Sequence, residues 1–304
     1  MNTLIIKLGA TGDVVRTTPL LSRLNSEVTW LTAEKNLVLL DGLQNDLRSL
    51  SWDARASLPD VEYDLVINLE DTLEAALYLK ELKFKQHFGA YADSENNLRY
   101  TDDSRRWFDL SLISVYGREQ ADRLKLQNRY TYQELIFDGL GLRFAGEVYL
   151  LPDPVETGLS GDVALAADAG PVWPMKKWAY YDQLKERLEE RGLKVNRLPE
   201  RSSLLEHLAD VRNHRCLVGG DSLPMHFALG SGKPCVTLFT CTSPWEIHDY
   251  GIQRKIISPL LEEFFYKRTY DSRATKAIGV DEVVSAVVDQ LKPAIPAADR
   301  VSIK

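Results

Sequence analysis

Two glycine-containing segments place polar side chains where an apolar run gives way to a helix-like pattern. The first is Gly9-Ala10-Thr11-Gly12-Asp13, and the second is Gly219-Gly220-Asp221-Ser222-Leu223. Glycine allows a tight turn and a close approach of backbone N–H groups to a ligand. A helix that begins after such a turn directs free N–H groups and the positive end of its dipole outward, which suits a phosphate. These segments are therefore the first candidates for a binding or catalytic site.

Asp13 lies near the start of the first of these helices and permits two interpretations. Under one, it only caps the helix, which aspartate does well. Under the other, it is a general base, because a carboxylate beside a substrate hydroxyl accepts its proton as the oxygen attacks. The glycine spacing is not GxGxxG, so a dinucleotide fingerprint is not supported. We expect Gly9, Thr11 and Gly12 to form an acceptor or phosphate loop beside Asp13.

The second segment combines a candidate phosphate-binding helix start with a hydroxyl and a histidine. Pro224 is tolerated in a first helical turn, where its missing N–H is not required. Ser222 adds a hydroxyl donor, whereas Asp221 would repel a phosphate and is expected to bind a sugar hydroxyl or to hold loop amides. His226 follows Ser222 by four residues and shares its helix face. A partly buried structural histidine is the alternative interpretation.

A third segment, Trp173-Pro174-Met175-Lys176-Lys177-Trp178, follows the first expected strand of the second half of the chain. A lysine at a helix start close to the proposed phosphate site would neutralise a leaving diphosphate. The alternative is an ordinary solvated lysine pair, because lysine is mostly exposed in proteins.

Other chemistries lack their sequence signals. There is no Asp-x-Asp sequence, and the three cysteines and five histidines have no zinc spacing. A Gly-x-Ser-x-Gly elbow and a Walker loop are also missing. Arg105-Arg106-Trp107 is too short a basic patch to indicate nucleic-acid binding. We therefore expect neither a metal nor a cofactor.

The composition is that of a folded, acidic protein. The chain has 304 residues, 44% of them hydrophobic, and its formal charge is 37 − 44 = −7. The negative charge argues against a nucleic-acid partner, since such binding is driven largely by phosphate neutralisation. No apolar run approaches the roughly 18 residues needed to span a bilayer, and no secretory signal precedes the first strand. We expect a cytoplasmic protein with at most peripheral contact to the inner membrane.

Apolar runs that read as strands alternate with helical patterns along the whole chain. Expected strands are residues 3–8, 27–32, 64–69, 162–167, 194–198, 215–218 and 234–239, and expected helices are 14–24 (interrupted by Pro19), 71–82, 178–191, 203–211, 223–229 and 281–291. This alternation predicts an α/β fold with parallel sheets covered by helices on both faces. Ligands of such sheets bind beyond the carboxyl ends of the strands.

The segment from Gly141 to Gly161 contains prolines and glycines and has no helical period. We place a domain boundary there and expect two Rossmann-like doubly wound domains, residues 1–150 and 151–304, that face each other across a cleft. Residues 293–304 are expected to form a loose tail.

Together these segments resemble glycosyltransferase family nine, the ADP-heptose:lipopolysaccharide heptosyltransferases. LIIKLGATGDVVRTTPLL is similar to the amino-terminal motif of that family, and GGDSLPMHFALGSGKPCVTLFTCTSP to its carboxy-terminal signature. Lys176-x-Trp178 is similar to the Lys-x-Trp of the family. The similarity spans both expected domains and the three motifs occur in the family's order.

The resemblance implies a GT-B fold, an inverting mechanism and no essential metal. It further implies an amino-terminal acceptor-binding domain and a carboxy-terminal domain that binds a nucleotide-diphospho-sugar, with ADP-heptose as the expected donor and a glycan or lipid-linked sugar as acceptor. The implied roles are catalytic base for Asp13, diphosphate contact for Lys176, donor-sugar contact for Asp221, phosphate binding for Ser222 and loop support for His226, with Trp178, Leu223 and Thr242 as further donor-site positions.

The sequence departs from the family at two places in the donor signature. Leu223 stands where the family usually has glycine, and Thr240-Cys241-Thr242 replaces Gly-Pro-Thr. Leucine does not adopt positive φ without cost, so a different phosphate loop is expected. The acidic composition also suggests an acceptor other than a highly phosphorylated lipid core. A sugar-nucleotide epimerase or hydrolase of the same fold and a non-catalytic sugar-nucleotide-binding protein are the alternatives.

Overall fold

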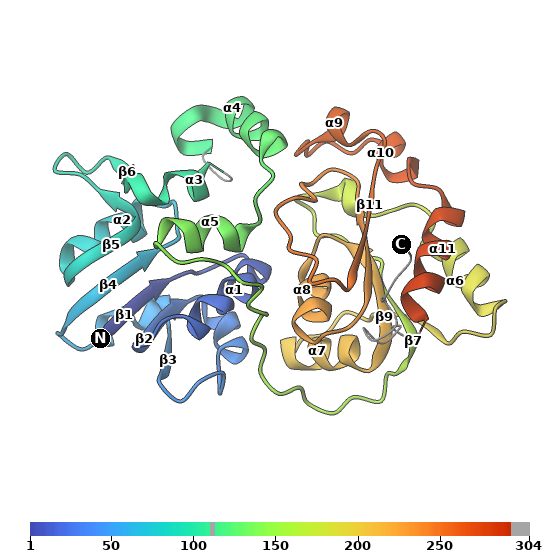
Figure 1. Ribbon diagram of the computed structural model, residues 1–304, viewed down its shortest axis with the longest axis horizontal. Helices are drawn as coiled ribbons and strands as arrows, with labels where there is room; N and C mark the ends of the chain where they lie inside the picture. The colour runs from blue at the N-terminus through green and yellow to red at the C-terminus, as the bar shows by residue number, and fades with distance from the viewer. Residues whose placement is uncertain (110–112, 293–304) are drawn as a thin grey trace, which may run out of the picture.

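The computed structural model describes residues 1–109 and 113–292, which form two α/β domains arranged beside each other (Figure 1). The expected alternation of strands and helices and the two Rossmann-like sheets are confirmed. The tail expected over residues 293–304 lies outside the described residues.

The first sheet has the strand order β3-β2-β1-β4-β5-β6. Its strands are β1 (Asn2–Ile6), β2 (Glu27–Thr32), β3 (Leu47–Ser51), β4 (Glu62–Asn68), β5 (Lys83–Ala92) and β6 (Leu98–Tyr100). All neighbours pair in parallel except β5 and β6. In β1, Ile5 packs on one face of the sheet while Leu4 and Ile6 pack on the other. Burial on both faces explains why this strand reads as a continuous apolar run.

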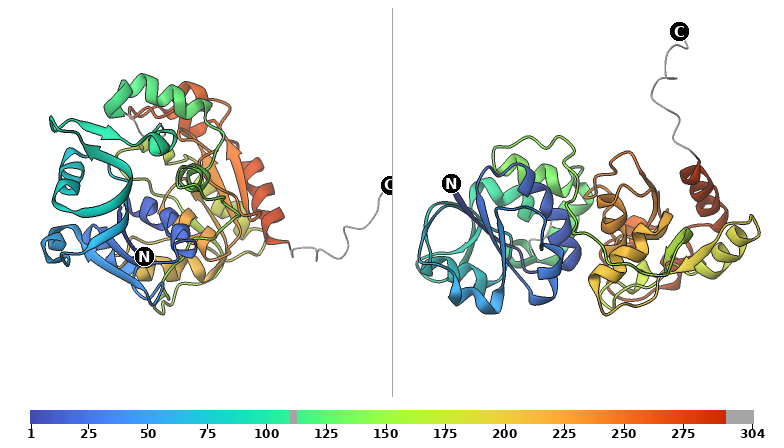
Figure 2. Two further views of the ribbon diagram at one scale, coloured as in Figure 1. Left: turned by 60° about the vertical axis from the view of Figure 1, so that its left-hand side comes forward. Right: turned by 90° about the horizontal axis from the view of Figure 1, so that it is seen from below.

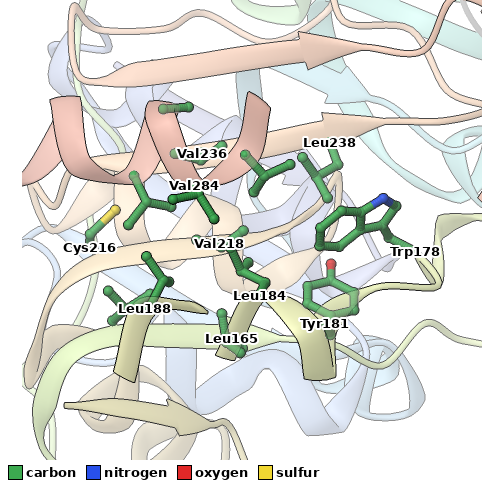
Figure 3. Close-up of a cluster of buried hydrophobic side chains, with 14 of the residues drawn as sticks. Leu165, Trp178, Tyr181, Leu184, Leu188, Cys216, Val218, Val236, Leu238 and Val284 are labelled. Carbon is green, nitrogen blue, oxygen red and sulfur yellow. The ribbon is translucent and has the colours of Figure 1, made fainter. Parts of the chain in front are cut away.

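The second sheet is parallel throughout, with the order β11-β10-β9-β7-β8. Its strands are β7 (Gly161–Ala166), β8 (Val195–Arg197), β9 (His214–Gly220), β10 (Cys235–Phe239) and β11 (Gln253–Ile257). Cys216 and Val218 of β9 face one apolar cluster and Leu217 faces another. Figure 3 shows the first of these clusters, in which sheet residues pack against Leu184, Leu188 and Val284.

Helices cover both faces of each sheet, as the alternation predicted (Figures 1 and 2). In the amino-terminal half they are α1 (Thr11–Thr17), α2 (Leu73–Tyr78), α3 (Arg105–Phe108), α4 (Ile113–Gln127) and α5 (Tyr132–Gly139). In the carboxy-terminal half they are α6 (Tyr181–Glu189), α7 (Leu204–Arg212), α8 (Leu223–Gly230), α9 (Leu261–Phe264), α10 (Ser272–Lys276) and α11 (Val280–Leu291). The helix predicted over 14–24 is α1 followed by a 3₁₀ turn, Thr18–Ser22, with Pro19 in its first turn.

Residues 140–160, which contain the predicted boundary, hold neither a helix nor a strand and connect the two sheets. The domains nevertheless share an apolar cluster, because Val15 of α1 and Leu39 pack with Leu208, Phe227 and other residues of the second domain. Helices α1 and α8 lie against each other across this interface. The loops that precede α1 and α8 are therefore brought to one region between the domains.

Candidate active site

Asp13 occupies the first turn of α1, at the carboxyl edge of the first sheet. One carboxylate oxygen, Oδ2, accepts the N–H of Ala10 at 3.2 Å, and the other, Oδ1, lies 2.9 Å from Nε of Arg16. The side chain is 32% exposed. Asp13 thus makes the local cap-type contact that its position predicted, and it also keeps an exposed edge that a substrate can reach.

The charges around Asp13 favour its ionised form. Burial acts to raise the pKa of this carboxyl, but Arg16, Lys7 and His226 act against it, and the net effect is a lowered pKa. Lys7 lies at the end of β1 and its Nζ is 2.8 Å from Glu70, which also accepts the N–H of Leu8 at 2.8 Å. The loop before α1 is therefore fixed by an ion pair, and Asp13 is a carboxylate at neutral pH.

Lys176 and Asp221 form an ion pair at the carboxyl edge of the second sheet. Nζ of Lys176 lies 3.2 Å from Oδ2 of Asp221 and also donates to the Asp221 carbonyl. Both side chains are largely buried, with 15% and 19% exposed. Although burial acts to raise the pKa of Asp221, Lys176, His226 and Arg16 lower it. Of the two interpretations of Lys176, the solvated surface pair is therefore wrong.

The start of α8 has the geometry that the sequence predicted, and it holds Leu223 without positive φ. Ser222 is the N-cap in extended conformation and Pro224 lies in the first turn, which carries no acidic residue. Leu223 is helical, and positive φ among the described non-glycine residues occurs at Asn96, Tyr250 and Tyr266 only. A glycine is therefore not required at position 223. The Leu223 side chain instead packs against the apolar cluster shared by the domains.

His226 of α8 packs against Gly12 of α1, across the domain interface. A Cβ on Gly12 would lie 3.0 Å from Cδ2 of His226, so any larger residue at position 12 would press on the imidazole. The ring is 4% exposed, and its Nδ1 has no hydrogen-bond partner among the described residues. Burial lowers the pKa of His226 to about 4, and the charges of Arg16 and Lys176 add to this effect, whereas Asp221 and Asp13 act to raise it. Candidate residues of both domains are therefore close enough to one histidine to act on its charge.

The loop after β10 borders the same region. Thr240 donates to the carbonyl of Met175 at 2.7 Å, which ties this loop to the segment that carries Lys176. Thr242 and Ser243 are buried, and neither hydroxyl has a hydrogen-bond partner among the described residues. Thr242 lies close enough to Asp221 to act on its pKa. The replacement of Gly-Pro by Thr240-Cys241 thus leaves the loop in the site.

A pocket of about 190 Å³ opens beside the Lys176–Asp221 pair. It is lined by Asp168, Ala169, Gly170, Val172, Trp173, Lys176, Gly220, Asp221 and Ser222. The predicted residues Lys176, Asp221 and Ser222 therefore share one concave surface.

The predicted residues Gly9, Thr11 and Trp178 are not among those that line this pocket. Gly9 and Thr11 are half-buried in the loop and first turn that carry Asp13. Trp178 is 2% exposed and lies in the core of the second domain, where its Nε1 donates to the carbonyl of Ile278 at 3.0 Å (Figure 3). These are the contacts of a core residue, so a role of Trp178 in donor binding stays a prediction.

Sequence reasoning gave no role to four side chains of this region, those of Arg16, Glu246, Trp173 and Tyr266. Arg16 pairs with Asp13 and approaches Glu246 of the second domain, with Nη1 3.9 Å from Oε2. Trp173 lines the pocket and stacks edge-on against Tyr266. The spacing of three residues between Asp13 and Arg16 on one helix was the only available signal for the first.

The described residues hold no group of three His, Cys, Asp or Glu side chains arranged to bind a metal ion. Nor does any helix within residues 1–109 and 113–292 have the length and apolar character needed to cross a membrane.

Comparison with known proteins gave matches among solved structures only. No family model and no curated protein matches the chain. A family-nine glycosyltransferase from Veillonella parvula matches 95% of this chain over 97% of its own length, with a TM-score of 0.59 and 14% identity. The Escherichia coli heptosyltransferase WaaC, solved with ADP, matches 95% of this chain over 100% of its own, with a TM-score of 0.61 and 14% identity.

A third match has a different subunit length. The iron-containing, dodecameric heptosyltransferase TibC from enterotoxigenic Escherichia coli, solved with ADP-D-β-D-heptose, matches 95% of this chain over 76% of its own, with a TM-score of 0.57 and 12% identity. The three matches agree in fold class with the resemblance found in the motifs. The chain therefore has the two-domain GT-B fold of the family-nine glycosyltransferases.

Proposed function

We propose that this protein is an inverting glycosyltransferase that moves a sugar, with heptose as the first candidate, from a nucleotide-diphospho-sugar to a hydroxyl acceptor. The observation that carries the proposal is that Asp13 and the Lys176–Asp221 pair, from different domains, both lie near the same histidine. His226 rests on Gly12 beside Asp13 and lies within the electrostatic reach of Lys176 and Asp221. This proximity supports a site in which Asp13 acts as the base and Lys176 binds the diphosphate.

The donor would bind on the second domain. Lys176 and the start of α8 would hold the diphosphate, since a helix start without acidic residues favours an anion. The diphosphate would compete with Asp221 for Lys176, which frees Asp221 to accept hydroxyls of the donor sugar. Unpaired hydroxyls at Thr242 and Ser243 offer further hydrogen bonds. Lys176 would stabilise the charge that develops on the leaving oxygen.

The acceptor would bind on the first domain, beside Asp13. This carboxylate would take the proton of the acceptor hydroxyl as its oxygen attacks the anomeric carbon and the nucleoside diphosphate leaves on the opposite face. Gly9, Thr11 and Gly12 shape the loop that the acceptor would meet. The mechanism uses no metal, since the side chains named here supply the base and the positive charge. The acidic chain favours an acceptor of a bacterial surface glycan that is not heavily phosphorylated.

The test is to mix the protein with ADP-heptose and a panel of sugar acceptors and to follow ADP release together with the mass of the products. We expect ADP release that depends on an acceptor and a product heavier by one heptose. Donor consumption without an acceptor would instead indicate an epimerase or hydrolase. Donor binding without turnover on any acceptor would indicate a sugar-nucleotide-binding protein, and the Thr240-Cys241 replacement would then be its most telling feature.

A further inference from the structure

Arg16 connects the carboxylates of both domains. Its Nε lies 2.9 Å from Oδ1 of Asp13, and its Nη1 lies 3.9 Å from Oε2 of Glu246. The guanidinium carbon is 3.9 Å from the ring centroid of Tyr132, and the side chain is only 15% exposed. Arg16 is therefore held by a stacked ring while it faces one carboxylate from each domain.

Glu246 is fixed at the interface independently of Arg16. Its carbonyl accepts the N–H of Tyr132 at 3.0 Å, and its carboxylate accepts the hydroxyl of Tyr266 at 3.3 Å. The side chain is buried, and Lys125 of α4 also acts on its charge. Because Arg16 belongs to the first domain and Glu246 to the second, the two side chains meet only when the domains are together.

We propose that Arg16 is a positioning residue for the transfer reaction: it keeps the Asp13 carboxylate ionised and directed into the site, and through Glu246 it links that arrangement to the contact between the domains. This inference rests on the proposed function, because it takes Asp13 to be the base. Arg16 itself need not touch either substrate.

The pair Arg99–Asp93 is a control for the Arg16–Asp13 pair in which the arginine is exposed, while the two aspartates are exposed to a similar extent, 23% and 32%. Nε of Arg99 lies 2.9 Å from Oδ2 of Asp93, the same separation, but Arg99 is 57% exposed. Exposed ion pairs contribute little because water and salt screen them. Removal of one partner of a buried pair is costly because it leaves a charge without its counter-charge.

The first experiment measures kcat/KM against pH for the parent, R16Q, R16K and R99Q. Removal of the arginine should move the acid limb to higher pH by about 1–3 units, since an opposite charge lowers an aspartate pKa by that amount. R16K should return the acid limb most of the way to its position in the parent, and R99Q should leave that position unchanged. A limb in R16Q that coincides with that of the parent would overturn the proposal.

Other charged groups also face this pair, so the shift must be assigned to Asp13. Asp13 is faced by Lys7, His226 and Tyr132 as well as Arg16, and Arg16 is faced by Glu246, Asp221 and Lys125. Repeating the profiles in an H226Q background removes the histidine that also titrates in acid. The shift should persist there. Its disappearance would assign the limb to His226 and contradict our inference.

A second experiment needs no activity. Urea unfolding of the parent, D13N, R16Q and D13N/R16Q at pH 7 should show non-additive effects, with a coupling of about tenfold or more in the unfolding constant, as residues in contact display. The D93N/R99Q cycle should be additive within about twofold. Additivity at Asp13 and Arg16 would refute the pairing. If the cycle shows coupling but the parent protein transfers no sugar, the proposed function is refuted while the pairing of Asp13 with Arg16 stands.

Discussion

Helices α1 and α8 both begin after a parallel strand, and they meet across the domain interface, yet their first turns have opposite chemical character. The first turn of α1 contains its own carboxylate, Asp13, whereas that of α8 contains no acidic residue. A carboxylate in a first turn satisfies the positive end of a helix from within. A first turn without one leaves that end for an external anion.

This difference matches the two roles proposed for the helices. The carboxylate on α1 is available to accept a proton, and the open start of α8 is available to hold a diphosphate. Asp221, which precedes α8, pairs with Lys176 in this structure, and in the proposed complex Lys176 would turn to the diphosphate while Asp221 binds the donor sugar. The comparison therefore predicts different losses when each side is altered.

The largest effect is expected at the α1 side. D13N removes the proposed base and should slow transfer by about 10²–10⁴-fold, with ADP affinity unchanged. D41N, at an exposed aspartate of the same domain, is the control. Sugar-transfer assays and calorimetric titration with ADP measure the two quantities. Unchanged turnover in D13N would remove Asp13 from the mechanism.

The histidine between the two helices should make stability depend on pH. Unfolded His226 binds its proton near pH 6.5 and the folded residue only near pH 4, because burial lowers the pKa to about 4. Acid therefore favours the unfolded state, and stability should fall by up to about 3 kcal/mol between those values. H226Q should lose less of its free energy of unfolding over this range. Parallel curves for parent and variant would show that His226 titrates normally.

The α8 side is tested by K176A, with K177A as the control. Lys176 is buried against Asp221, while Lys177 is 61% exposed. Loss of a hydrogen bond to a charged group costs about 1.5–3 kcal/mol, so ADP affinity should fall by about 10- to 100-fold in K176A. K177A should bind like the parent. Equal affinity in both variants would return Lys176 to the role of a structural ion pair.

The G12A substitution tests the contact between helices α1 and α8. A Cβ at Gly12 would press on His226, whereas one at Gly158 would meet nothing within 4 Å. Overpacking costs about 1–3 kcal/mol and outweighs the helix-propensity gain of up to about 1 kcal/mol. Thermal unfolding should therefore show a net loss for G12A and none for G158A. A more stable G12A would mean that the imidazole moves away freely.

The smallest effect is expected for L223G, which introduces the residue that family-nine glycosyltransferases usually have. Because Leu223 is helical and not at positive φ, glycine relieves no strain. ADP affinity should change by no more than about twofold, a difference of about 0.5 kcal/mol. A large gain in affinity would show that leucine obstructs the phosphate site.

The sequence was most informative where local chemistry determines structure. A glycine-containing turn after an apolar run predicted that a helix follows each of the two strands, and the carboxyl ends of parallel strands lie at one edge of a sheet. Pro19 predicted the end of the first α-helix. The helix itself begins at Thr11 and not at Val14, since its first turn is polar and lacks the apolar period.

Features that depend on tertiary contacts escaped prediction. Strands β3, β5, β6 and β11 were missed because they are partly exposed and carry charged residues. The motif that suggested a donor-site role for Trp178 gave no sign that its ring packs in the core of the second domain. Glu246 joins Arg16 only through the apposition of the domains, which no spacing in the chain reveals.

The most direct test of the account is a crystal structure with ADP. The account predicts the diphosphate between Nζ of Lys176 and the first turn of α8, with the Lys176–Asp221 pair separated and Asp13 facing the position of the departed sugar. A nucleotide bound elsewhere, with that pair intact or with Asp13 turned away from it, would contradict the account.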